Sequence, residues 1–333
     1  MKRKIFAILA FLLCVTNVHA AVGQAVIDGV NYVLSSDGEV NTATVVAGDK
    51  KYAGHVAIPS IVTYAGIQYK VTAVDNEAFS QCDGLQSITF GDNVTTIGDK
   101  AFLGCNQLTE VVLPQSLTSI GTYAFCFCSG LKTIDIPNSV TNLGGCCFAQ
   151  CTNATSLKIG SGVNTIPSNA FERCYSLTNV VIPKNVNLIK NYAFLDCRKL
   201  TSVTILSDAI SINGSDVFRG CSALDSLVFG ESVNTIRSSS FTLGNRTNVI
   251  SLAKYPPVCE GDTSPFAGVS PYCVLYVPKG SAPDYRMAKG WAGQFRAVRE
   301  MTDSDHSANC DVNGDGVVDI ADATAVIECI LAK

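Results

Sequence analysis

The chain has 333 residues, of which 47% are hydrophobic and 16% charged, so it can bury a large core and lacks the composition of a long disordered protein. Acidic residues outnumber basic ones by 28 to 24, and the net charge of −4 argues against a nucleic acid as partner. After the first 20 residues, no stretch has the 18 or so apolar residues that a membrane-spanning helix needs.

Residues 1–20 have the features of a secretory signal peptide. A basic segment at 2–4 precedes an apolar run at 5–15, and Val18-His19-Ala20 ends in the small residue typical of a cleavage site. We expect cleavage after Ala20, which leaves 21 basic against 28 acidic residues, and a secreted or cell-surface protein. Cys14 raises the alternative of a lipoprotein, although the residue before it is Leu rather than a small one.

Residues 21–73 predict short strands separated by turns. The runs IDGVNYVL at 27–34 and IVTYAGIQYKV at 61–71 alternate in polarity around Asp-Gly or Ala-Gly pairs, a pattern that favours β-hairpins. We expect them to form an N-terminal β cap, because the segment that follows needs its first sheet edge covered. His55 lies in one of these strands and is interpreted as an ordinary surface residue.

Residues 74–246 repeat with a period of 23 residues and a single step of 24. Phenylalanine recurs once per repeat, and cysteine follows three residues later in every repeat but the last. The columns are Phe79, Phe102, Phe125, Phe148, Phe171, Phe194, Phe218 and Phe241, and Cys82, Cys105, Cys128, Cys151, Cys174, Cys197 and Cys221. A repeat this short cannot bury its own apolar face, so we expect stacked repeats with one continuous core.

Each repeat also contains an L-x-x-L-x-L pattern, as in LTEVVL at 108–113, which predicts one short strand per coil in a parallel sheet. The segment at 101–105 is expected to turn the chain on the opposite side as a single helical or 3₁₀ turn. The predicted fold is therefore a β-rich α/β solenoid of about eight 23-residue coils.

The repeat at 120–140 reads IGTYAFCFCSGLKTIDIPNSV and resembles the BspA-like leucine-rich repeats of bacterial surface proteins. This resemblance covers roughly half of the chain and implies a leucine-rich repeat solenoid in an exported adhesion or ligand-binding protein. Residues 247–301 resemble the closing module of that family. Here the pattern predicts a strand at Val274–Val277 and a helix from about Ala282 to Trp291, with Ser281 as N-cap.

The residues expected on the open face of the sheet are mainly Ser, Thr and Val. They are Ser87, Thr89, Glu110, Val112, Thr133, Asp135, Ser156, Lys158, Asn179, Val181, Ser202, Thr204, Ser226 and Val228. We expect Thr204→Ala to cost under about 1 kcal/mol, as for an exposed residue. The central surface, formed by Glu110, Val112, Asp135, Lys158 and Val181, is predicted to bind a protein or glycan because it is furthest from both caps.

Fourteen cysteines follow residue 20 in a chain that is expected to be exported. Those in the column are expected to pack as small apolar side chains, because parallel neighbours rarely reach the torsion of a disulfide. Cys126 and Cys146 lie outside the column, which leaves a local disulfide open but supplies too few ligands for a zinc site. A disulfide between Cys259 and Cys273 is also left open.

A polar segment at 302–309 leads to the loop DVNGDGVVDIAD at 311–322, which has the ligand spacing of a calcium site. The predicted ligands are Asp311, Asn313, Asp315, Val317 through its carbonyl, Asp319 and Asp322. The Asp at the last position, followed at once by a helix, resembles a type I dockerin repeat. This resemblance implies calcium as cofactor and a cohesin-like module as partner.

The helix expected after this loop, at about 320–331, has one apolar face. It carries Ala323, Val326, Ile327, Ile330 and Leu331. Dockerins carry two such repeats and this sequence contains one, so the apolar face is left to pack on the repeats, on another copy of the chain or on a partner.

Two functions of different classes follow from these patterns. The first is an exported recognition or adhesion protein that binds a macromolecule through the sheet face. The second is a non-catalytic subunit of a polysaccharide-degrading assembly, attached through the dockerin-like tail at 302–333. An enzyme is not expected, because only His55 and His306 follow the signal peptide and no phosphate loop, nucleophile elbow or zinc-binding helix motif occurs.

Overall fold

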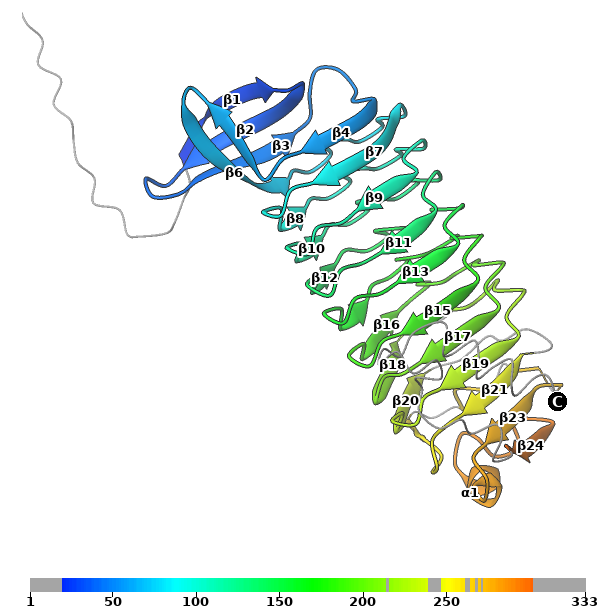
Figure 1. Ribbon diagram of the computed structural model, residues 1–333. Helices are drawn as coiled ribbons and strands as arrows, with labels where there is room; N and C mark the ends of the chain where they lie inside the picture. Colours follow the sequence, from blue (N-terminus) through cyan, green and yellow to red (C-terminus); the bar gives the residue numbers. More distant parts are fainter. Residues whose placement is uncertain are drawn as a thin grey trace, which may run out of the picture.

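The computed structural model describes residues 20–213, 216–238, 247–260, 264–266, 269–270 and 272–301. The signal peptide, the predicted repeat position Phe241 and the predicted calcium loop and helix lie outside these ranges. The described chain forms an elongated solenoid of stacked coils (Figure 1). The predicted β-rich solenoid with a parallel sheet is therefore confirmed, and α1 (Ala282–Met287) is its only α-helix within the described ranges.

One side of the solenoid, which we call face A, carries one strand from each coil (Figure 1). Its strands are β4 (Gly54–Ile58), β7 (Leu85–Phe90), β9 (Glu110–Val112), β11 (Thr133–Asp135), β13 (Ser156–Lys158), β15 (Asn179–Ile182), β17 (Ser202–Ile205), β19 (Ser226–Phe229), β21 (Asn248–Ser251), β23 (Val274–Val277) and β24 (Ala297–Glu300). Neighbouring strands pair in parallel within the runs β4-β7-β9, β11-β13 and β15 to β24.

A second parallel sheet, face B, was not predicted from the sequence. Its strands are β8 (Thr96–Ile97), β10 (Ser119–Ile120), β12 (Asn142–Leu143), β14 (Thr165–Ile166), β16 (Leu188–Lys190), β18 (Ala209–Asn213), β20 (Thr235–Ser238) and β22 (Val258–Glu260). Most of these strands have only two to four residues. They are too short to show an alternating pattern of their own, which explains why the sequence did not reveal them.

The N-terminal strands form two antiparallel hairpins, as the sequence predicted. They are β1 (Ala20–Ile27) with β2 (Val30–Ser36), and β5 (Ile61–Tyr64) with β6 (Ile67–Val74), while β3 (Asn41–Val46) joins β2 to β6. Both hairpins turn on two residues with positive φ, Asp28-Gly29 and Ala65-Gly66, as two-residue turns of this type require. Because β6 pairs with β8, these strands extend face B.

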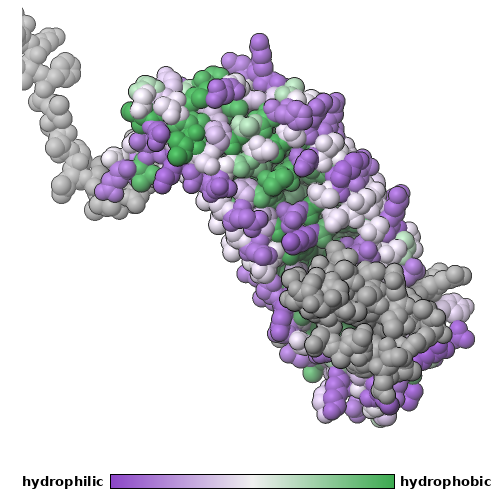
Figure 2. Space-filling model, in the orientation of Figure 1, coloured by the Kyte–Doolittle hydropathy of each residue, from purple (hydrophilic) through white to green (hydrophobic). Residues whose placement is uncertain are grey.

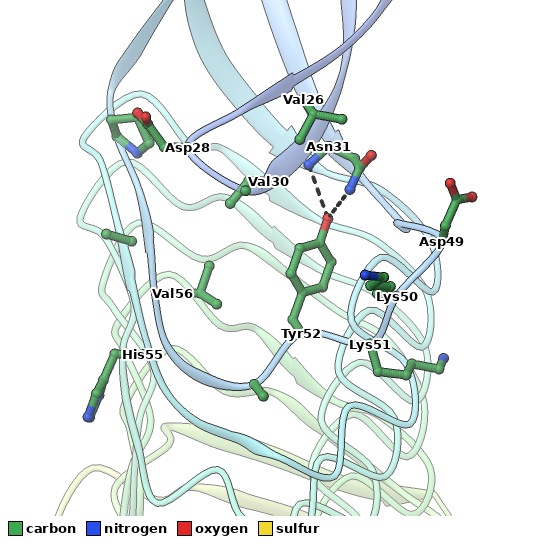
Figure 3. A pocket seen from close by; sticks show the side chains of 14 residues that line it. Val26, Asp28, Val30, Asn31, Asp49, Lys50, Lys51, Tyr52, His55 and Val56 are labelled. Atoms are coloured by element: carbon green, nitrogen blue, oxygen red, sulfur yellow. Dashed lines mark hydrogen bonds between the residues drawn. The ribbon is translucent and has the colours of Figure 1, made fainter.

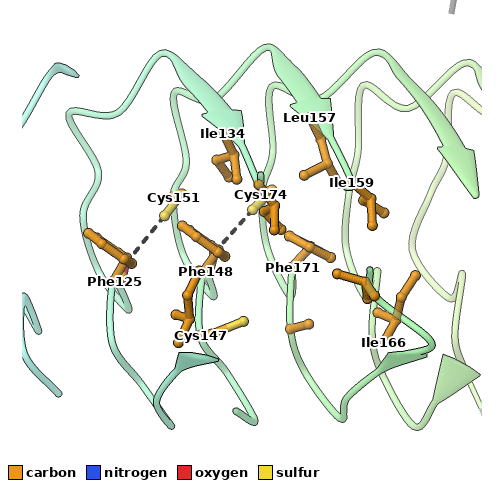
Figure 4. Packing of buried hydrophobic residues seen from close by; sticks show 14 of the residues in the cluster. Phe125, Ile134, Cys147, Phe148, Cys151, Leu157, Ile159, Ile166, Phe171 and Cys174 are labelled. Atoms are coloured by element: carbon orange, nitrogen blue, oxygen red, sulfur yellow. Dashed lines mark hydrogen bonds between the residues drawn. The ribbon is translucent and has the colours of Figure 1, made fainter. Parts of the chain in front are cut away.

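The phenylalanine column forms a continuous stack through the core. From Phe79 to Phe218, neighbouring ring centroids lie 4.9 to 6.0 Å apart with interplanar angles of 1° to 19°. Figure 4 shows Phe125, Phe148 and Phe171 in this arrangement. These rings are at most 2% exposed, and such contacts contribute about 0.5 to 1.5 kcal/mol per pair beyond burial.

The cysteine column is buried and reduced, as predicted, and it also makes a hydrogen bond that the sequence did not show. In each coil from Cys105 to Cys221, the thiol donates to the carbonyl oxygen of the phenylalanine in the preceding coil, at 3.0 to 3.3 Å. The bonds from Cys151 to Phe125 and from Cys174 to Phe148 are drawn in Figure 4. A small apolar side chain without a donor would leave these carbonyls without this bond.

The prediction of a helical or 3₁₀ turn around the phenylalanine is wrong. In each described coil, the residues two before and two after the phenylalanine have positive φ, for example Lys100 at 54° and Gly104 at 74°. This alternation points successive N–H groups toward the next coil, so that Lys100, Phe102 and Gly104 donate to carbonyls of the following repeat at 2.7 to 2.8 Å. The N–H groups between them, of Leu103 and Cys105, donate within the coil to the carbonyls three residues earlier, at 3.1 and 3.2 Å, so hydrogen bonds between coils alternate with turn bonds inside one coil.

The C-terminal module differs in part from the prediction. Strand β23 forms as expected, but α1 ends at Met287 rather than near Trp291, because Ala288 is already extended with ψ of 134°. Ser281 does not cap this helix with its side chain; its hydroxyl donates instead to the Lys254 carbonyl at 2.7 Å. Trp291, 1% exposed, donates to the Pro257 carbonyl at 2.9 Å and packs against several rings at this end of the core.

The stack predicts a large cost for removing one ring. Phe171→Ala should lower the free energy of unfolding by about 3 to 5 kcal/mol, because it removes two stacking contacts and leaves a cavity. Thr133→Ala, on exposed face A, should change it by less than about 0.5 kcal/mol. Urea unfolding of both variants measures the difference, and equal small losses would contradict a shared core.

Candidate functional site

The outer side of face A is the candidate functional surface, because the strands place its side chains in columns. One column, which we call the outer column, comprises Thr89, Val112, Asp135, Lys158, Val181, Thr204, Val228, Ile250 and Tyr276. Within each paired run, these residues are direct neighbours on adjacent strands, about 4.8 Å apart. The predicted ligand-binding residues other than Glu110 all belong to it.

The first half of the outer column is open to solvent. Thr89, Asp135 and Lys158 are exposed, Val112 is 60% exposed, and Val181 is half-buried. Glu110 is also exposed and lies two residues before Val112 on β9. The structure thus brings the five predicted ligand-binding residues onto consecutive strands of one side, where they present both charge signs and an apolar side chain.

The second half of the outer column is buried, and the prediction of an open face is wrong there. Thr204 is 5% exposed, Val228 2% and Ile250 0%, while the neighbouring Ser202 and Ser226 are 7% and 1% exposed. Met301 packs against Val228 and Ile250 from above the sheet. Alternation along a strand identified the outward residues correctly, but it carries no information about what lies over them. The small cost expected for Thr204→Ala therefore no longer applies.

His55 lies at the first strand of face A and contacts the second. Its Nδ1 is 2.5 Å from the Ser87 hydroxyl, and both side chains are accessible to solvent. A serine nucleophile needs a base that is itself held by a third group. No carboxylate in the described part of the chain is hydrogen-bonded to this ring, so the pair has the character of a surface hydrogen bond between β4 and β7.

A pocket of about 820 Å³ lies between the β1–β2 turn and β4 (Figure 3). Tyr52 stands in its wall, where the Asn31 side chain donates to the Tyr52 hydroxyl at 3.0 Å. Asp28, Asp49, Lys50 and Lys51 also line it, so the two charge signs are balanced. In Figure 2, hydrophobic residues gather on the surface over these N-terminal strands. The lining selects no single class of ligand.

The cysteines outside the column do not form the disulfides that the sequence left open. Cys126, Cys146, Cys259 and Cys273 are all in the reduced form. Burial raises the pKa of Cys126 and Cys259 to about 12, so both are protonated at neutral pH. Protonated thiols are poor metal ligands and nucleophiles. Within the described ranges, no group of three or more His, Cys, Asp or Glu side chains could hold a metal ion.

The predicted calcium ligands, from Asp311 to Asp322, all lie outside the described residues. Among the described helices, none is long and apolar enough to cross a membrane.

Comparison with known families identifies the type of repeat in this chain. The family model of the BspA type leucine-rich repeat region matches residues 60–177 and 143–255, with six copies of the repeat. The two matches together extend over more than half of the 333 residues. The chain belongs to the BspA-type leucine-rich repeat family. No protein of curated function matches the sequence.

Solved structures share the fold of this BspA-type protein. A leucine-rich repeat protein from Bacteroides ovatus is 20% identical, with 83% of this chain and 76% of that chain covered at a TM-score of 0.51. A leucine-rich cell surface protein from Faecalibacterium prausnitzii is 19% identical, with 90% and 99% covered at 0.51. The T. pallidum leucine-rich repeat protein is 28% identical, with 58% and 86% covered at 0.50.

The buried thiols make the stability of this BspA-type protein sensitive to alkaline pH. Burial raises the pKa of Cys126 and Cys174 from 9.0 to about 12. Between these values the unfolded chain loses thiol protons that the folded chain keeps. The free energy of unfolding should therefore be constant below about pH 9 and fall as the pH rises toward 12, by about 1.4 kcal/mol per thiol and pH unit.

Urea unfolding at about pH 8 and about pH 10 under reducing conditions measures this loss. The Cys174→Ala variant is the control, because it is less stable at both pH values but has one titrating thiol fewer. Its loss between the two pH values should be smaller than that of the unmodified chain. The same loss in both proteins would show that Cys174 is not a buried, protonated thiol.

Proposed function

We propose that this protein is an exported, non-catalytic recognition protein that binds a protein or glycan through the open half of face A. The proposal is carried by one observation. Glu110, Val112, Asp135 and Lys158 are exposed on the consecutive strands β9, β11 and β13 of face A. A solenoid of this kind offers an extended binding surface without an enclosed catalytic pocket.

The chemistry of this surface suits a large and weakly charged ligand. Val112 offers apolar area, Glu110 and Asp135 accept hydrogen bonds, and Lys158 donates them. With both charge signs present, long-range attraction is small, so the affinity depends on direct contacts and changes little with salt. Face A is also preformed by its strands, which reduces the entropy lost on binding.

Export is supported by the N-terminal segment and by the family. The basic and apolar residues before Ala20 have the order of a secretory signal peptide. BspA-type repeats are typical of cell-surface and secreted proteins. We therefore place the protein outside the cytoplasm, either at the cell surface or released from it.

The second candidate function is that of a non-catalytic subunit in a polysaccharide-degrading assembly. It is favoured by the loop at 311–322, whose Asp and Asn spacing suits one calcium ion. In this proposal the loop binds calcium through Asp311, Asn313, Asp315, Val317, Asp319 and Asp322, and the tail attaches to a cohesin-like module.

Ligand binding should depend on the open half of face A. An array of glycans and extracellular host proteins provides the probe, and Val112→Asp or Lys158→Glu should weaken binding to any hit by roughly tenfold, about 1.4 kcal/mol. Lys100→Glu is the matched control, since its side chain is 46% exposed on a turn rather than on a strand of face A. Stronger loss at Lys100 than at Val112 and Lys158 would place the site elsewhere.

Calcium binding should require the loop and not the sheet. Calorimetry on the full chain should show one weakly bound calcium, and Asp322→Ala should abolish binding by removing a loop carboxylate. Asp135→Ala, which removes an exposed carboxylate of face A, should leave it unchanged. A full chain that binds no calcium at about 1 mM would end the dockerin-like proposal.

A further inference from the structure

The residues of the outer column are exposed in its first half and buried in its second half, although the strands stay in the same register. Thr89 and Val112 are neighbours on β7 and β9 and face solvent, whereas Thr204 and Val228 are neighbours on β17 and β19 and are 5% and 2% exposed. All four point outward from the same side of the solenoid. The difference therefore arises from cover over the second pair and not from the strands themselves.

The described chain ends on this buried region. The Met301 backbone N–H donates to the Val277 carbonyl at 2.8 Å, and the Met301 side chain, 3% exposed, packs with Val228 and Ile250. Leu252 and Tyr276 pack around this cluster. This apolar cluster therefore extends from β19 and β21 to the last described residue of the chain, just after β24.

We propose that the segment after Met301, residues 302–333 of the same chain, docks on the buried region formed by Thr204, Ser226, Val228, Ile250 and Met301. We call this region the docking patch. The occupant is the amphipathic helix predicted at about 320–331, with its apolar side toward the sheet. The proposal is independent of the ligand on the open half of face A.

The dimensions and the chemistry of the segment fit the docking patch. A 12-residue helix is about 18 Å long, which matches the roughly 14 Å across the four strands β17, β19, β21 and β23. Its apolar side carries Val326, Ile327 and Ile330. Val228 and Ile250 offer an apolar surface of the same kind.

Ser226 provides a second, independent observation. Its hydroxyl is buried in the docking patch, and no hydrogen-bond partner for it exists among the described residues. Buried hydroxyls are satisfied in folded proteins in the large majority of cases. The docked segment supplies a polar partner from directly above the sheet. Docking then confines the ligand surface to the open half of face A.

Photo-crosslinking tests the proposal on the full chain in about 1 mM calcium. A photoreactive amino acid replaces Thr204, and in a second protein it replaces Thr89, the matched position of the open half. The proposal expects an intrachain crosslink from position 204 to a peptide within 302–333, and none from position 89. A crosslink from 204 to a second copy, to another region, or to nothing would overturn it.

Hydrogen exchange gives a second readout with a point substitution. Val228→Asp should speed amide exchange in residues 320–331 by roughly tenfold, a loss of about 1.4 kcal/mol of protection, whereas Val112→Asp should leave it unchanged. Protection of β9 and β11 amides shows that the solenoid is folded. If Val228→Asp unfolds it, Thr204→Asp at the edge of the docking patch replaces it. A folded variant with unchanged exchange in 320–331 would contradict docking.

Discussion

The contact between successive coils is the interaction on which the rest of the structure depends. A single coil has few contacts of its own, and its core side chains meet their counterparts one repeat away, as the parallel rings of Phe102 and Phe125 do. The thiol of Cys128 bonds to the carbonyl of Phe102, and the N–H of Phe102 bonds to the next coil. Side-chain contacts and backbone hydrogen bonds therefore both stabilise the stacking of coils along the axis of the solenoid.

This dependence explains the positive φ values on the turns. A residue such as Tyr123, with φ of 57°, adopts a conformation that is unfavourable for a side chain with a Cβ atom. Its N–H gains a hydrogen bond at 2.9 Å to the Gly145 carbonyl of the following coil. The local cost is offset only when that coil is present, so the turn geometry follows from stacking and not from local preference.

The sequence predicted the core positions that recur once per repeat, but it did not predict the features that depend on contacts with neighbouring coils. The period placed Phe171 and Cys174 in the core, and both are fully buried. The thiol donors, the turns and face B arise from bonds between coils, which no single repeat displays. The exposure of Val112 agrees with strand alternation, whereas Thr204 is 5% exposed although alternation also directs it outward. The candidate site was thus predictable only where nothing covers it.

The strands of face A are paired in register, so residues of its open half can be compared directly with residues of its buried half. We propose that the open half binds a ligand and that the buried half docks the segment at 302–333. Hydroxyl-radical footprinting of the full chain compares the matched valines Val112 and Val228 in one experiment. The account predicts ready oxidation of Val112 and strong protection of Val228 and Ile250, in line with exposures of 60%, 2% and 0%. Equal oxidation of Val112 and Val228 would contradict the division of face A into an open and a covered half.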